Sequence, residues 1–110
     1  MGTEKQKYEV GGGKDKEISL PANYDRLSPA ERKKVREEYT RIQDGKCWFC
    51  ENLLTEDPAS HVLAKPVHRR LFPESFFKYP VHLHHDHDTG KTIGAVHAYC
   101  NAVLWEYYGQ

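Results

Sequence analysis

Residues 83–91 read LHHDHDTGK, so three of the chain's seven histidines and two aspartates lie within residues 84–88. A neutral imidazole binds metal ions, and its ordinary pKa of about 6.5 lets it exchange a proton near physiological pH. A surface loop does not need this density of imidazole, and a packed strand interior would not tolerate it. The stretch therefore indicates a metal site, acid–base chemistry, or a strand edge that is rich in histidine.

Four further residues have the types and the spacing of a structural zinc site. Cys47 and Cys50 form one pair, and His97 and Cys100 form a second pair of the same spacing. Structural zinc takes four nitrogen or sulfur ligands in a tetrahedron, so the two pairs complete one site. A redox-active Cys-x-x-Cys pair is the alternative, but no βαβ pattern surrounds these cysteines. With all four positions filled, we expect this zinc to be structural and to do no chemistry.

The composition predicts one small domain that needs such a staple. Only 38% of the 110 residues are hydrophobic, which indicates a thin core. Residues 1–20 are polar and charged and contain a GGG run, so we predict a flexible N-terminal tail. Residues 21–110 are predicted to form a single α+β domain.

A long helix is predicted over about residues 28–44. Ser28 is a suitable N-cap, Pro29 suits the first helical position, and Glu31 completes a capping box. Gly45 suits a left-handed cap after the last turn. The apolar stripe of this helix is narrow and consists of Val35, Tyr39 and Ile42. Its other faces carry basic residues, namely Arg32, Lys33, Lys34, Arg36 and Arg41. We interpret these charges as a solvated helix face, with contact to a phosphate backbone as the alternative.

The remaining segments are predicted to hold the chemistry in place. They are a zinc knuckle at 47–50, an irregular loop over 55–79 with a short strand near Ser60–Ala64, and a β-hairpin followed by a helix over 80–109. The last helix begins near the zinc ligand Cys100, so the zinc would fix the position of the next residue, Asn101, relative to the hairpin.

The alternation of side chains along a strand sorts the histidines of the hairpin. His85 and His87 would share one face of a regular strand. His84 and Asp86 would share the other face. We interpret Asp86 and Asp88 as turn and strand-end residues, with an orienting hydrogen bond from Asp86 to a catalytic histidine as the alternative for Asp86.

The run HHDHDTGKTIGAVHAYCN, with Cys-x-x-Cys upstream, resembles the recombination endonuclease VII branch of the HNH nucleases, also called ββα-metal or His-Me finger nucleases. The resemblance covers about residues 45–105. It includes the matching residues His85, Asp86, His87, Thr89, Gly90, Lys91, Gly94, Cys100 and Asn101. It implies a ββα-metal finger, that is, a short hairpin plus a helix with structural zinc, after the long N-terminal helix.

The sequence departs from the family at two positions. His97 stands where the family has cysteine, which is a conservative change for a zinc ligand. His84 stands where the family has the catalytic aspartate, although other HNH nucleases carry a His-His pair whose first member binds the catalytic ion. A neutral ligand at this position would weaken binding of hard Mg²⁺ and favour softer ions such as Mn²⁺, Ni²⁺ or Zn²⁺.

The resemblance implies a metal-dependent DNA endonuclease, a phosphodiester hydrolase that leaves 5′-phosphate and 3′-hydroxyl ends. His85 would be the general base, and His84 and Asn101 would hold a catalytic divalent ion, Mn²⁺ or Mg²⁺ with Ni²⁺ or Zn²⁺ as further candidates. His87 would contact the phosphate or assist the leaving group. A second register, with His61 as the base, stays open. His68 and His82 are interpreted as surface or packing residues.

The expected substrate is duplex or branched DNA. Lys plus Arg equals Asp plus Glu, at 16 each, so DNA binding must depend on a local basic patch. For this patch we select Arg69, Arg70, Lys78 and Lys91. Monomer and homodimer are both open. The N-terminus has no signal-peptide pattern and no apolar run is long enough to span a membrane, so we expect a cytoplasmic protein of phage or bacterial type. A non-catalytic zinc ribbon that binds nucleic acid or protein is the rival hypothesis.

Overall fold

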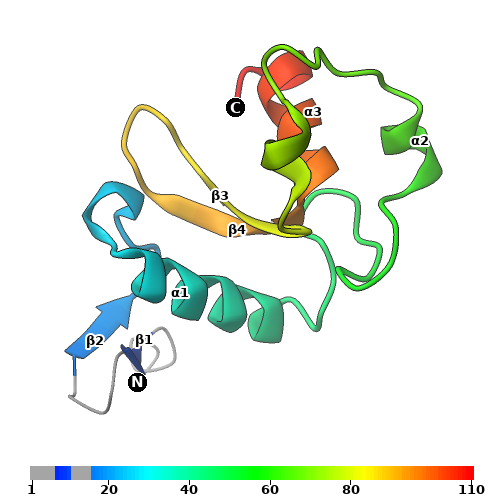
Figure 1. Ribbon diagram of the computed structural model, residues 1–110. Coiled ribbons are helices and arrows are strands. Elements are labelled where there is room, and N and C mark those ends of the chain that lie inside the picture. Colours follow the sequence, from blue (N-terminus) through cyan, green and yellow to red (C-terminus); the bar gives the residue numbers. More distant parts are fainter. Residues whose placement is uncertain (1–6, 11–15) are drawn as a thin grey trace.

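The computed structural model describes residues 7–10 and 16–110 (Figure 1). Its elements are β1 (Lys7–Val10), β2 (Lys16–Ser19), α1 (Pro29–Ile42), α2 (Ser60–Leu63), β3 (Val81–His85), β4 (Thr92–His97) and α3 (Ala98–Tyr108), with short 3-10 helices at Tyr24–Arg26 and Glu74–Phe77. The strands form two antiparallel pairs, β1 with β2 and β3 with β4. The predicted α+β class is therefore confirmed. Within the described residues, no helix has both the length and the apolar character needed to cross a membrane.

Strands β1 and β2 lie where the sequence predicts a flexible tail. Their backbones pair in antiparallel register, from Lys7 opposite Ser19 to Val10 opposite Lys16. Residues 1–6 and 11–15 of the predicted tail lie outside the described residues.

The β3–β4 hairpin is the centre of the domain, with α1 and α3 packed along it (Figure 1). Its register pairs Val81 with His97 and shifts between His84 and His85. The core consists of buried apolar side chains from these elements, chiefly Val35, Tyr39, Leu83, Ala95, Val96, Val103 and Leu104. Burial of one such valine or leucine side chain contributes roughly 1.5–3 kcal/mol. The two helices thus hold the hairpin, and the histidines on it, in a fixed position.

Helix α1 begins as predicted and ends earlier than predicted. Ser28 and Glu31 form the capping box, but the C-cap is Gln43, and Gly45 follows with a φ of 76°. The Gln43 side chain accepts from the Ala95 N–H at 2.9 Å and donates to the Ala95 carbonyl at 3.0 Å. The helix therefore ends where the side chain of its C-cap residue pairs with β4. Gly94 allows this approach, since an added Cβ would lie 2.8 Å from Gln43 Oε1.

The loop after the zinc knuckle contains a helix where the sequence predicts a strand. Residues Ser60–Leu63 form α2, whose first carbonyl accepts from the N–H of Ala64 at 3.0 Å. One helical turn satisfies its own backbone groups and buries Val62, whereas a lone strand here would lack a pairing partner. Further along, the hydroxyls of Tyr99 and Tyr107 donate to loop carbonyls at 2.6 Å and attach the loop to α3.

Candidate metal centre and histidine cleft

The four predicted zinc ligands converge at one point. The ligand atoms of Cys47, Cys50, His97 and Cys100 all lie within 4.8 Å of one another. His97 Nδ1 lies 3.5 Å from Cys50 Sγ and 3.6 Å from Cys100 Sγ. Tetrahedral zinc with bonds of about 2.3 Å to sulfur and about 2.0 Å to nitrogen places such atoms roughly 3.5 Å apart. These residues are therefore positioned to hold a metal ion, in a way consistent with structural zinc.

Backbone carbonyls orient the histidine of this site. His97 Nε2 lies 2.9 Å from the carbonyl oxygens of both Leu53 and Glu56. A carbonyl only accepts, so Nε2 carries the proton, and the Nδ1 lone pair is directed at the sulfurs. The tautomer that metal binding needs is already set by the loop around the knuckle.

The first cysteine of the knuckle is prepared as a thiolate. The pKa of the Cys47 thiol is lowered to about 4, first by its hydrogen bond with the Cys100 side chain and further by backbone N–H donors. Among these donors, the N–H of Phe49 lies 3.3 Å and that of Cys50 lies 3.5 Å from Cys47 Sγ. A deprotonated sulfur with N–H donors around it is the form that binds zinc.

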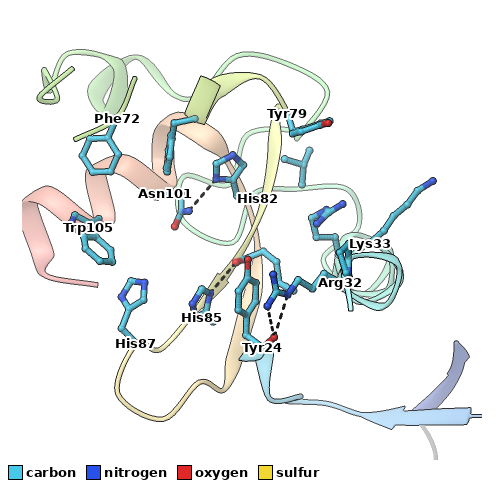
Figure 2. Close-up of a pocket in the computed structure, with 15 residues that line it drawn as sticks. Tyr24, Arg32, Lys33, Phe72, Tyr79, His82, His85, His87, Asn101 and Trp105 are labelled. Atoms are coloured by element: carbon cyan, nitrogen blue, oxygen red, sulfur yellow. Dashed lines mark hydrogen bonds between the residues drawn. The ribbon is translucent and has the colours of Figure 1, made fainter. Parts of the chain in front are cut away.

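A separate cleft of about 650 Å³ lies between α1, the hairpin and α3 (Figure 2). It brings together His85, His87 and Asn101 from the predicted catalytic set and adds His82. One wall is basic and consists of Arg32, Lys33 and Arg36 of α1. The other lining residues are largely aromatic and include Tyr24, Phe72, Phe76, Tyr79 and Trp105. A phosphate group entering this cleft would meet cations on one side and imidazoles on the other.

His85 lies at the end of β3, directly after the shift in strand register. Its Nδ1 lies 3.4 Å from the Leu83 carbonyl, which can only accept, so Nδ1 carries the proton and Nε2 keeps its lone pair. Burial is the main cause that lowers the pKa of the His85 imidazole. The ring is therefore neutral at pH 7 and able to take up a proton.

His82 contacts Asn101 within the cleft, although the sequence indicates only a surface or packing role. His82 Nδ1 lies 3.1 Å from Asn101 Nδ2. The backbone carbonyls of Phe76 and Tyr79 also hydrogen-bond to this ring, and burial lowers its pKa. His82 Nδ1 therefore accepts from the Asn101 amide N–H, and His82 does not engage the amide oxygen Oδ1.

His84 lies behind the cleft and does not line it. It is 1% exposed, its ring centroid is 5.5 Å from that of Trp48, and its Nε2 is 3.4 Å from Gln110 Oε1. Burial lowers the pKa of His84, and the hydrogen bonds that its ring donates to the Gln110 and Asn101 side chains partly offset this. Asn101 therefore interacts with His82 in the cleft and with His84 behind it.

His87 lies close to His85, but it does so from the turn after β3 and not from the same face of a regular strand. His87 lies in the turn, and its ring centroid is 4.8 Å from that of His85 and 4.2 Å from that of Trp105. Asp86 caps this turn, because its Oδ1 accepts the N–H groups of Asp88 and Thr89 at 2.7 and 2.9 Å. The interpretation of Asp86 as a turn residue is confirmed.

The basic residues selected from the sequence do not line the cleft. The guanidinium of Arg69 lies 4.8 Å from the centre of the Phe77 ring, and Arg70, Lys78 and Lys91 are exposed. The cations that line it come from α1, whose charges we interpret from the sequence as a solvated face. Arg32 and Arg36 are four residues apart and share one face of the helix, and this spacing was visible in the sequence. His61 is exposed on α2, outside the cleft lining.

In comparisons with known proteins, no family model, curated protein or solved structure matches this chain. The function is therefore inferred from the residues of the cleft and from their geometry.

Proposed function

We propose that this protein is a metal-dependent endonuclease that hydrolyses phosphodiester bonds in DNA and is stapled by zinc at its Cys3His site. The observation that carries the proposal is the combination of residues in one cleft: a neutral His85 with a free Nε2, the Asn101 amide, and three cations of α1. A zinc ribbon that only binds a partner needs neither the imidazoles nor the amide in this arrangement.

His85 supplies the base. Water is a poor nucleophile at pH 7, and a neutral imidazole removes its proton as it attacks the phosphorus. The hydrogen bond to Leu83 fixes the tautomer in which Nε2 is the accepting atom. His87, next to His85, contacts the phosphate or assists departure of the 3′ oxygen.

The cations of α1 hold the scissile phosphate. Arg32 and Arg36 line the same cleft as His85, and guanidinium groups bind phosphate oxygens in bidentate fashion. The chain has no net positive charge, so binding depends on this local patch and weakens steeply with salt. The predicted products carry 5′-phosphate and 3′-hydroxyl ends.

The catalytic ion expected from the resemblance would bind at Asn101, which lines the cleft. A divalent ion, when bound, would stabilise the negative charge on the phosphate and the leaving oxygen. Asn101 Oδ1 and an imidazole nitrogen would hold it, and such mixed oxygen and nitrogen donors favour Mn²⁺ over Mg²⁺. The ligand expected from the sequence is His84, which lies behind the cleft. His82 is the competing nitrogen ligand, because it lies in the cleft and contacts the same amide. Equal activity with low Mg²⁺ and low Mn²⁺ would count against a histidine ligand.

A plasmid-nicking assay tests the proposal. Zinc-loaded wild-type protein is incubated with supercoiled DNA and Mg²⁺, Mn²⁺, Ni²⁺ or Zn²⁺ in separate reactions. We expect cleavage with Mn²⁺, a loss of roughly 100-fold or more in His85→Ala, and little change in the matched variant His61→Ala. Intact plasmid under every ion would reject the nuclease and favour the zinc-ribbon hypothesis. Cleavage that depends on His61 and not on His85 would show that the second register is correct.

A further inference from the structure

The ring of Tyr24 lies between the imidazole of His85 and the guanidinium of Arg32 (Figure 2). The Tyr24 and His85 rings are parallel, with centroids 3.8 Å apart and an interplanar angle of 7°. Arg32 Cζ lies 3.8 Å from the centroid of the Tyr24 ring. At these distances the two groups cannot share one face, so they cover opposite faces of the tyrosine.

The backbone of Tyr24 is fixed from two directions. Its N–H donates to the Gly90 carbonyl at 2.7 Å, which attaches it to the turn of the hairpin. Its carbonyl accepts from Arg32 Nε at 3.2 Å and from Nη2 at 3.0 Å, which attaches it to α1. Gly90 permits the close approach, because its φ is 80° and an added Cβ would lie 2.9 Å from Asn23 Oδ1.

These contacts limit how the His85 ring can turn. One face of the imidazole is covered by Tyr24, and Nδ1 is engaged by the Leu83 carbonyl. A partial rotation about χ2 would break the parallel stack, and a half turn, which restores the stack, would move Nδ1 away from the Leu83 carbonyl. The ring therefore stays in one orientation, and Nε2 is the nitrogen left for the cleft.

We propose that Tyr24 is a positioning residue for the reaction, which stacks on His85 and, with Arg32 on its other face, holds the imidazole ready to deprotonate water. This proposal rests on the proposed function. Tyr24 acts through His85 and takes part in no bond change itself. It also couples the base to the basic wall of the cleft, since Arg32 contacts both the ring and the carbonyl of Tyr24.

The stack uses the ring and not the hydroxyl, which gives a pair of variants with opposite expectations. Tyr24→Phe keeps the ring and should cut DNA within about 2-fold of wild type. Tyr24→Leu removes the stack and should lower kcat about 10-fold with KM little changed, because the base is misoriented while the phosphate-binding cations remain. The control is Tyr108→Leu, an exposed tyrosine of α3 outside the cleft.

Nuclear magnetic resonance of the zinc-loaded protein tests the same claim without activity. In wild type and Tyr24→Phe, the His85 ring protons should be shifted upfield by the aromatic ring, and the nitrogen shifts should report protonated Nδ1. In Tyr24→Leu the upfield shift should vanish and the tautomers should mix. Wild-type activity equal to that of Tyr24→Leu, or the absence of the upfield shift from the wild-type spectrum, would overturn the proposal.

The two failures are distinguishable. A wild-type protein that shows the shifted His85 resonances but cuts no DNA would reject the nuclease and keep the stack. A protein that cuts DNA through His85 but shows no stacked imidazole would reject the role of Tyr24. If Tyr24→Leu does not fold, as judged by zinc content and thermal melting, the wild-type and Tyr24→Phe spectra decide alone.

Discussion

The zinc centre and the histidine cleft use similar side chains for different purposes. At the zinc centre, the spare nitrogen of His97 is bonded to two carbonyls, and the sulfur of Cys47 is surrounded by N–H donors. In the cleft, His85 Nε2 has no hydrogen-bond partner among the residues that the structure describes. Polar atoms that are all hydrogen-bonded to one another stabilise a fold. An atom without a hydrogen-bond partner beside basic side chains can instead bind a substrate.

Removal of a zinc ligand should have the largest effect. We expect Cys100→Ser to lose the metal and unfold at room temperature, because zinc binding in small domains contributes about 10–16 kcal/mol, as much as or more than a domain's whole stability of about 5–15 kcal/mol. Zinc content by mass spectrometry and circular dichroism measure this. His61→Ala, an exposed histidine, is the control. A folded, zinc-free Cys100→Ser protein would show that the centre is not a staple.

Loss of the amide in the cleft should spare the fold and reduce activity. We expect Asn101→Ala to retain zinc and to lower the cleavage rate about 10- to 100-fold, with partial recovery at high Mn²⁺, since the proposed ligand of the catalytic ion would be gone. His82→Ala and His84→Ala, assayed across a Mn²⁺ titration, identify the second ligand. The variant with the larger rise in the Mn²⁺ requirement marks it, and the prediction from the sequence is His84.

Substitutions in the basic wall should change the affinity for DNA more than the rate of the cleavage step. Arg36→Gln is expected to weaken DNA binding and to reduce the slope of log affinity against log salt by about 1, which is the loss of one phosphate contact. Lys34→Gln removes an equal charge from the same helix, outside the cleft lining, and should leave the slope unchanged. Equal slopes of log affinity against log salt for the two variants would indicate that the basic residues of α1 face solvent and do not contact DNA. Fluorescence anisotropy with labelled DNA gives both values.

The attachment of the loop to α3 should give the smallest effect. Glu106 accepts from the His68 N–H at 2.9 Å, and this bond is the main cause that lowers the pKa of the Glu106 carboxyl. A carboxyl group whose pKa is lowered by folding stabilises the protein at pH values above its ordinary pKa. This stabilisation is lost as the pH falls through the lowered pKa. Glu106→Gln should therefore melt slightly below wild type at pH 7, and the difference should vanish in acid. A gap in melting temperature that widens in acid would contradict this.

The sequence was sufficient to identify the four candidate ligands of the Cys3His site, because the two members of each ligand pair are close in the sequence. Two ligand pairs of matched spacing identify Cys47, Cys50, His97 and Cys100 before any fold is known, and the capping box at Ser28 likewise depends on near neighbours in the chain. Such patterns are read from types and intervals alone. The hairpin followed by the glycine-ended helix α3 was predictable for the same reason.

The cleft was predicted only in part, because its lining residues come together only when elements that are distant in the sequence pack against one another. Which face of α1 meets the hairpin decides that Arg32, Lys33 and Arg36 line the cleft and Lys34 does not. The contact between His82 and Asn101 joins β3 to α3, and no pattern in the sequence of either element indicates it. Tyr24 reaches His85 only because its backbone bonds to the hairpin turn at Gly90. The basic patch chosen from the loop was dense in sequence, but its residues lie outside this lining.

The most direct test of the account measures metal and cleavage in the same samples. Wild type and His85→Ala are purified with zinc, their zinc content is quantified, and each is assayed on supercoiled plasmid with added Mn²⁺. We predict one zinc per chain in both proteins and cleavage by wild type alone, reduced roughly 100-fold or more by the substitution. Cleavage by His85→Ala at the wild-type rate, or no cleavage by zinc-loaded wild type, would contradict the account.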